Sequence, residues 1–233
     1  EGDDITDQIE AHRKEYPMGE LLVALDGKRH VQSRQLISSL FTPSRLKANR
    51  EYVTNLAEKM IRGVVANGGC ELISEIASPF VTFVVSDILG VPESDREAFR
   101  RLIDLAPPPG DMESAPPPGM EEEWALNPPK PEKDFVHPMV YMGEFFYRYI
   151  AERRAKEPQP DVLSEFAHAR FSDGTQPDIP ELIMLATFLF GAGQDTSAKL
   201  IGNAMRYLVD EPGLQEQLRA DTKLIPAFLE ETL

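Results

Sequence analysis

Residues 178–210 predict one long helix, and this helix constrains the fold more than any other part of the chain. Asp178 can cap its N-terminus, Pro180 suits the first turn, and Glu181 stands three residues after the cap. At about 1.5 Å per residue such a helix would measure roughly 47 Å, enough to cross a whole domain. The chain is therefore expected to fold around it.

The middle of this predicted helix contains residues that weaken helices. Residues 182–193 are almost wholly apolar, which predicts burial on all sides, but Gly191 and Gly193 interrupt the run. Each costs a helix interior roughly 1 kcal/mol relative to alanine. Asp195 and Thr196 follow, and we expect both on the buried side. Two explanations remain open: close approach of something flat or bulky, or a tight helix crossing in which Thr196 bonds back to the preceding turn.

Helical periodicity extends along the rest of the chain. It predicts helices over 28–41, 44–67, 71–89, 93–105, 138–156, 161–170 and 212–219, with a last helix starting near residue 226. No pair of strand patterns joined by a hairpin turn lies between them. We therefore predict a mainly α fold in a single domain over residues 1–233.

Residues 106–138 depart from this pattern because they hold ten of the chain's twenty prolines. Repeated proline predicts extended chain, and a stretch of this length is either a functional lid or a linker. Trp124 and several methionines within it favour a segment that closes over apolar material. We expect a lid here.

The net charge of −15 argues against general nucleic-acid binding, because contacts to phosphates require a basic surface. Residues 1–26 carry eight acidic and two basic side chains, whereas residues 28–50 carry six basic and no acidic ones. This basic segment is either a solvated helix face or a docking patch for an acidic partner. No segment resembles a signal peptide or a membrane span, so we expect a soluble, cytoplasmic protein.

Few residues suggest a metal or nucleophilic site. Cys70 is the only cysteine, and its position before an apolar run predicts a partly buried side chain rather than a reactive thiol. Glu165 and His168 have the spacing of half a di-iron site, but the matching half is missing. His30 and Arg34 share a predicted helix face and can both donate to one anionic group, unless they are a chance surface pair.

Four segments together carry a family resemblance. Residues 26–43 contain His30 and Arg34 and end in Phe-Thr-Pro, residues 89–96 begin Leu-Gly-Val-Pro, residues 192–196 are Ala-Gly-Gln-Asp-Thr, and 224–233 end in Phe-Leu-Glu-Glu-Thr-Leu. In this order and spacing they resemble the C helix, the E-to-F connection, the oxygen-binding I-helix motif and the approach to the K helix of the cytochrome P-450 superfamily. These proteins are haem-thiolate monooxygenases, and the likeness is to the soluble bacterial members.

The resemblance implies the helical part of the cytochrome P-450 fold, approximately its C to K helices, without the N-terminal and C-terminal parts that contain sheet. Glu231 matches the glutamate of the K-helix Glu-x-x-Arg motif, and the chain stops at Leu233 before the arginine. The axial cysteine of the family would lie beyond Leu233, and Cys70 is not that ligand. We therefore expect an internal fragment that holds no metal ligand and is inactive alone.

The resemblance also implies a cofactor and a reaction. The cofactor is haem b (iron protoporphyrin IX), and the reaction inserts one oxygen atom of dioxygen into an apolar organic substrate. Asp195 and Thr196 are the implied catalytic residues, delivering protons. The implied cofactor-binding residues are His30, Arg34, Ala192 and Gly193. The implied substrate-binding residues are Phe188, Gly191 and Ala192.

Two further segments acquire roles by the same resemblance. Residues 106–138 fall in the F–G region and would form a substrate-entry lid, and the basic segment 28–50 falls on the proximal face, where a ferredoxin-type electron donor would dock. The alternative function is a non-catalytic helical ligand-binding or interaction module, in which the glycines of residues 191–193 only permit tight packing.

Overall fold

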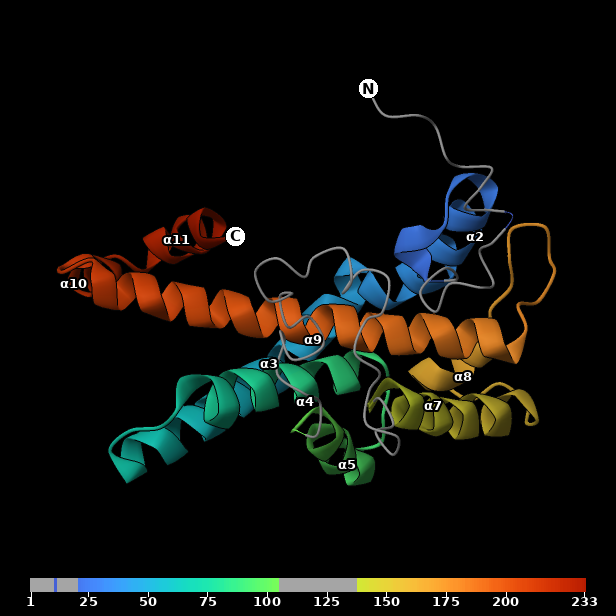
Figure 1. Cartoon of the computed structure of the whole chain (residues 1–233), viewed down its shortest axis with the longest axis horizontal. Helices are drawn as coiled ribbons and strands as arrows, with labels where there is room; N and C mark the ends of the chain where they lie inside the picture. Colours follow the sequence, from blue (N-terminus) through green and yellow to red (C-terminus); the bar gives the residue numbers. More distant parts are fainter. Residues whose placement is uncertain (1–10, 12–20, 105–137) are drawn as a thin grey trace, which may run out of the picture.

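The computed structural model describes residue 11, residues 21–104 and residues 138–233 of the 233-residue chain. The described helices are arranged around α9 (Ile179–Asp210), which runs almost the full length of the molecule (Figure 1). Asp178 caps this helix by accepting a hydrogen bond from the Glu181 amide at 2.8 Å, and Pro180 lies in the first turn. The long helix predicted from the sequence is thus confirmed.

The remaining described elements are also helical. In chain order they are η2 (Leu22–Ala24), α2 (Gly27–Ser38), η3 (Ser39–Phe41), α3 (Pro43–Asn67), the π-helix η4 (Leu72–Ala77), α4 (Ser78–Ile88), α5 (Glu93–Asp104), α7 (Pro138–Arg154), α8 (Val162–Ala167), α10 (Leu214–Ala220), η5 (Thr222–Leu224) and α11 (Ile225–Thr232). The described residues contain no strand, which confirms the mainly α fold class. Apart from Pro138, the expected lid lies outside the described residues.

The helix predicted over residues 71–89 is divided in the structure. Its first part is the π-helix η4, in which the Ser78 amide donates to the Ile73 carbonyl, five residues back. Pro79 follows in the first turn of α4 and has no N–H to donate to the turn before it. The proline therefore accounts for the change from π- to α-helical hydrogen bonding at this point.

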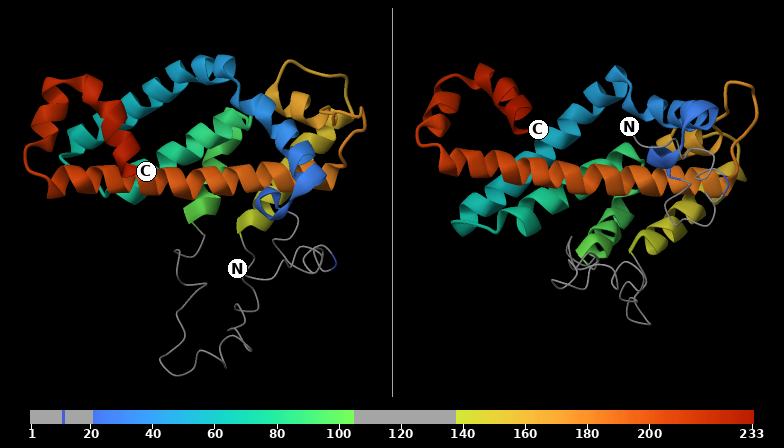
Figure 2. Two further views of the ribbon diagram at one scale, coloured as in Figure 1. Left: turned by 90° about the horizontal axis from the view of Figure 1, so that it is seen from above. Right: turned by 45° about the horizontal axis from the view of Figure 1, so that its top comes forward.

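The other helices cover α9 from different sides. α4 and α7 pack directly on it, and α5 lies against both of them. α10 and α11 fold back along the C-terminal end of α9, and α2 lies beside its N-terminal half (Figure 2). No described helix combines the length and the apolar character needed to cross a bilayer.

The main core contains a cluster of aromatic rings from three helices. Phe99 of α5, Phe146 of α7 and Phe190 of α9 are fully buried. The Phe99 ring centroid lies 5.2 Å from that of Phe190 and 5.6 Å from that of Phe146. Such pairs contribute about 0.5–1.5 kcal/mol beyond the area they bury. Phe190 directly precedes the glycines of α9, so this cluster fixes α9 just before the predicted site.

The connection between α4 and α5 is held by Arg96. Its guanidinium donates to the Asp87 carboxylate at 2.7 Å and to the Val91 carbonyl at 3.0 Å, and it lies over the Tyr52 ring. Gly90 takes a left-handed φ of 74° in this turn, which favours glycine. A Cβ at Gly90 would also come within 2.9 Å of the Val162 Cβ. Both requirements explain the glycine in the Leu-Gly-Val-Pro segment.

Candidate active site

The centre of α9 has a packed face and an open face. The packed face, which we define as Gly193, Gln194 and Ala198, lies against η4 and α4. Ala198 is buried there in a small apolar cluster with Ala77 and Val81. The open face, which we define as Ala192 and Thr196, is exposed. Successive residues of an α-helix are about 100° apart around its axis, so Gln194 and Thr196, two residues apart, point in nearly opposite directions.

Gly193 lies on the packed face, where its missing side chain makes room for α4. A Cβ at Gly193 would lie 3.2 Å from Val85 Cγ2, closer than ordinary van der Waals contact. The tight helix crossing considered from the sequence is therefore present at this glycine. Ala192, one residue earlier, faces outward with only a methyl group. Gly193 and Ala192 therefore lie on different sides of the helix.

Thr196 and Asp195 do not lie on a buried side, and that expectation was wrong. Helix α4 covers the opposite side of α9, which leaves Thr196 exposed and the Asp195 side chain 50% exposed. The Thr196 hydroxyl donates to the Ala192 carbonyl at 2.7 Å, the back-bond considered from the sequence. Lys199 Nζ donates to Asp195 Oδ2 at 2.7 Å along the same helix. Both polar groups therefore have partners within α9.

Of the predicted substrate-binding residues, Ala192 belongs to this open face and Phe188 lies close to it. Phe188 is half-buried and packs against the main core, one turn before Ala192. Gly191 is also half-buried, between the buried ring of Phe190 and the exposed Ala192. One stretch of α9 therefore carries Phe188, Ala192 and Thr196 at intervals of four residues, which is about one turn of helix.

The predicted cofactor-binding pair lies on another helix. Asp26 caps α2, in which His30 is half-buried and Arg34 is exposed. Within the described residues, no hydrogen bond or ion pair joins either side chain to residues 192–196, and neither side chain has a carboxylate partner. The structure therefore brings together the predicted residues of α9 but does not connect them to His30 and Arg34.

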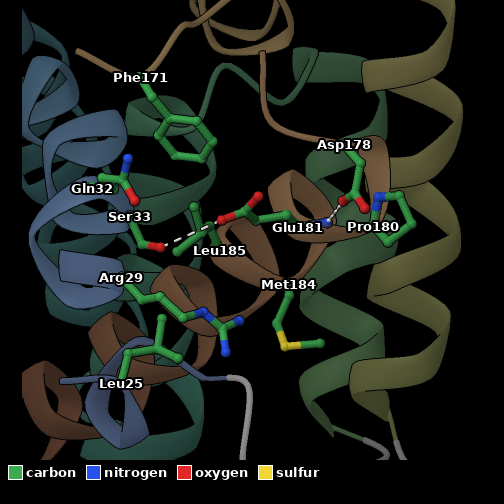
Figure 3. A pocket seen from close by; sticks show the side chains of 10 residues that line it. All are labelled: Leu25, Arg29, Gln32, Ser33, Phe171, Asp178, Pro180, Glu181, Met184 and Leu185. Carbon is green, nitrogen blue, oxygen red and sulfur yellow. Dashed lines mark hydrogen bonds between the residues drawn. The ribbon is translucent and has the colours of Figure 1, made fainter. Parts of the chain in front are cut away.

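A cavity of about 600 Å³ lies where α2 meets the first turns of α9 (Figure 3). Ser33 and Glu181 face each other across it, with Ser33 Oγ 3.5 Å from Glu181 Oε1, a weak hydrogen bond at that length. Met184 and Phe171 contribute apolar walls. None of the predicted site residues lines this cavity. Thr196 lies fifteen residues after Glu181, about 22 Å along the helix, so the cavity and the motif are separate.

The remaining candidates have ordinary surroundings. Cys70 is exposed, so the prediction of a partly buried thiol was wrong; it lies in the short connection between α3 and η4. Glu165 pairs with Arg45, and both ring nitrogens of His168 lie within hydrogen-bonding distance of backbone carbonyls. Among the described residues, no three His, Cys, Asp or Glu side chains form a group that could hold a metal ion. Glu231 is exposed on α11.

A family model described as Cytochrome P450 matches residues 2–226. The chain belongs to the cytochrome P450 family. Similar relatives include the putative cytochrome P450 YjiB of Bacillus subtilis, which is 28% identical over 218 residues, covering 93% of this chain and 52% of YjiB. The cytochrome P450 monooxygenase PikC of Streptomyces venezuelae is 30% identical over 210 residues, covering 89% of this chain and 45% of PikC.

Solved P450 structures superpose on this chain over most of its length. Mycobacterium marinum cytochrome P450 CYP150A6, in the substrate-free form, matches with a TM-score of 0.80 and 39% identity, covering 100% of this chain and 50% of its own. The ligand-free structure of cytochrome P450 TbtJ1 matches with a TM-score of 0.73 and 27% identity, covering 99% and 58%. The chain therefore has the fold of a helical part of a P450 and spans about half the length of its relatives.

The structure adds residues that the sequence did not assign. Lys199, the partner of Asp195, stands four residues after it, and that spacing could have suggested an ion pair. Gln194 lies inside the motif and donates from Nε2 to Ser78 Oγ at 3.0 Å. These two residues are 116 positions apart in the chain, so no local pattern could have linked them.

Proposed function

We propose that the full-length P450 containing this chain is a monooxygenase that inserts one oxygen atom of dioxygen into an apolar organic substrate. Haem b would be the cofactor, and Asp195 and Thr196 would deliver protons. The observation that carries the proposal is the open face of α9: away from the contacts of this helix with α4 and η4, Ala192 and Thr196 are exposed one turn apart. A methyl group and a small hydroxyl group leave room for a flat cofactor and a small oxygen molecule.

The described residues fit haem in two respects. The open face has no bulky side chain at Ala192 or Thr196, so a flat ring system can approach the helix. His30 and Arg34 stand four residues apart on α2 with no acidic partner among the described residues, and both can hydrogen-bond to the propionates of haem. Haem bound there would supply the oxidising chemistry. The chain itself supplies position and protons.

Proton delivery would depend on releasing two contacts within α9. The Thr196 hydroxyl can turn from the Ala192 carbonyl to another staggered rotamer and hydrogen-bond a water on the open face. The half-exposed carboxylate of Asp195 can exchange protons with solvent once it leaves Lys199. An exposed pair of this kind is worth only about 0.3–0.5 kcal/mol, so that release costs little.

The same proposal implies where the substrate and the redox partner would bind. Phe188, Gly191 and Ala192 would line an apolar substrate pocket, and residues 106–138 would form its lid. A ferredoxin-type donor would dock on the basic segment, where Lys47 and Arg50 are exposed on α3. Arg45 contributes less to such a patch because it pairs with Glu165.

One spectrum separates this proposal from the non-catalytic alternative. The reduced, carbon-monoxide-treated full-length protein should show the shifted absorption band of thiolate-ligated haem. The absence of that band in folded protein would favour a helical binding module, in which Gly193 serves only the contact with Val85.

Two substitutions test the catalytic pair. In the full-length protein, Thr196→Ala should divert donor electrons from product to peroxide, because the hydroxyl no longer holds a proton source in place. Asp195→Asn should slow turnover and change its solvent isotope effect. Unchanged product per electron in the first variant would rule out the role of Thr196, and an unchanged rate and isotope effect in the second would show that protons arrive elsewhere.

A further inference from the structure

The amide of Gln194 ties the motif to a distant helix. Its Nε2 donates to Ser78 Oγ at 3.0 Å, and both side chains are partly buried. The acceptor is itself held in place. Ser78 stands at the junction of η4 and α4, its amide donates to the Ile73 carbonyl, and its carbonyl accepts from the Thr82 hydroxyl at 2.8 Å. Gln194 therefore bonds to a fixed point.

Two glycines of α9 leave room for side chains of α4 and η4 near this hydrogen bond. A Cβ at Gly193 would lie 3.2 Å from Val85 Cγ2, and a Cβ at Gly202 would lie 2.9 Å from Ile73 Cδ1. The glycines are nine residues apart, about 13 Å along α9. Their partners come from α4 and η4, on either side of Ser78 in the chain. α9 thus meets α4 closely at Gly193 and bonds to Ser78 through Gln194, whereas Gly202 leaves room only for the flexible end of the Ile73 side chain.

The opposite side of the helix carries the proposed oxygen site. Gln194 and Thr196 are two residues apart, which places them about 200° apart around the axis of α9. If α9 rotated about its own axis and moved Gln194 away from Ser78, Thr196 on the opposite side would turn through the same angle. Such a change in the position of Thr196 matters, because a misplacement of a reacting group by about 1 Å can lower a reaction rate on the order of 100-fold.

We propose that Gln194 is a positioning residue: its hydrogen bond to Ser78 sets the rotation of α9 and thereby the direction in which Ala192 and Thr196 face. This inference rests on the proposed function, because it assigns Gln194 a part in proton delivery without contact to the reacting atoms. The contact of Gly193 with Val85 limits how closely α9 and α4 approach, and the hydrogen bond selects one rotational setting.

The test uses Gln194→Leu, Ser78→Ala and the double variant in the full-length P450. Each single variant removes one partner of the bond, and Ser78→Ala does so with little change in volume. Gln215→Leu is the matched control, since it removes an amide that donates to the Leu208 carbonyl at 3.3 Å, away from the motif. Two quantities are measured: the fraction of donor electrons released as peroxide, and hydrogen exchange of the backbone amides of residues 192–200 in the haem-free protein.

Gln194→Leu and Ser78→Ala should each raise the peroxide fraction severalfold and accelerate exchange in residues 192–200, and the double variant should do no more than either alone. Gln215→Leu should change neither quantity. Faster exchange with an unchanged peroxide fraction would show a merely structural bond and overturn the positioning role. If Thr196→Ala releases peroxide but Gln194→Leu does not, the proposed function stands and this inference fails. If Thr196→Ala itself has no effect, both fail.

Discussion

At the scale of single residues, Tyr149 shows how one buried polar group joins two helices. Tyr149 of α7 is 4% exposed, and its hydroxyl donates a hydrogen bond to the Asp95 carboxylate of α5. Burial and this hydrogen bond raise the pKa of Tyr149 from 10.0 to about 12, while the nearby Arg148 acts in the opposite direction. The folded state therefore favours the neutral phenol.

The raised pKa predicts an alkaline loss of stability. Because the pKa of Tyr149 is higher in the folded state, its contribution is complete below about pH 10 and is lost as the pH rises towards about 12. Tyr149→Phe should lower the free energy of unfolding by about 1–2 kcal/mol at pH 8, through loss of the bond to Asp95. Denaturant unfolding of both proteins from pH 8 upward measures the difference, which should shrink above pH 10. A constant difference would contradict the assigned cause.

At the scale of elements, α9 depends on how its first turn is held. Asp178 accepts from the Glu181 amide, and Arg154 of α7 donates to the Pro177 carbonyl at 2.7 Å just before the cap. Burial lowers the pKa of Arg154, and the charge of Asp178 partly offsets that effect. The start of the longest helix is therefore fixed both by its own cap and by a neighbouring helix.

Removal of the cap should weaken α9 from its N-terminus. Asp178→Ala leaves the Glu181 amide without its side-chain acceptor and should cost about 1 kcal/mol in the free energy of unfolding. Asp178→Asn keeps an acceptor oxygen and should retain most of that stability, so the pair of variants separates the cap from the charge. Thermal or denaturant unfolding provides the measurement. Equal losses in both variants would assign the effect to the charge near Arg154 instead.

At the scale of the whole molecule, charge is distributed unevenly over an acidic protein. The basic segment 28–50 includes exposed side chains at Lys28, Lys47 and Arg50. Arg45 of this segment forms an ion pair with Glu165 of α8. A field from such a patch acts mainly on the rate at which an acidic partner associates.

Charge reversal should therefore slow docking of an acidic ferredoxin-type donor. In the full-length protein, Lys47→Glu together with Arg50→Glu should lower the association rate about tenfold at low ionic strength and weaken its salt dependence. Lys59→Glu is the control, because Lys59 is exposed on the same helix about 18 Å farther along. Stopped-flow reduction measures the rate. Lys59→Glu changes the charge by half as much as the double variant, so half the decrease in the logarithm of the rate would show a response to net charge rather than a docking patch.

The sequence alone determined most of the helices. Asp178, Pro180 and Glu181 marked the start of α9, and Gly90 with Pro92 marked the end of α4, because caps and breakers act through local hydrogen bonds. The π-helical start of the predicted 71–89 helix was not foreseen, although Pro79 was its local signal. Family resemblance, carried by four segments in register, was also contained in the sequence.

Only the tertiary structure decided which way the residues of the motif face. Gly191 and Gly193 look alike in the sequence, and Asp195 and Thr196 were expected on a buried side. Contacts with Val85 and Ser78, more than a hundred positions away, place Gly193 on the packed face and leave Thr196 exposed. A helical pattern fixes the angles between side chains, but the rotation of the helix is set by whatever packs against it.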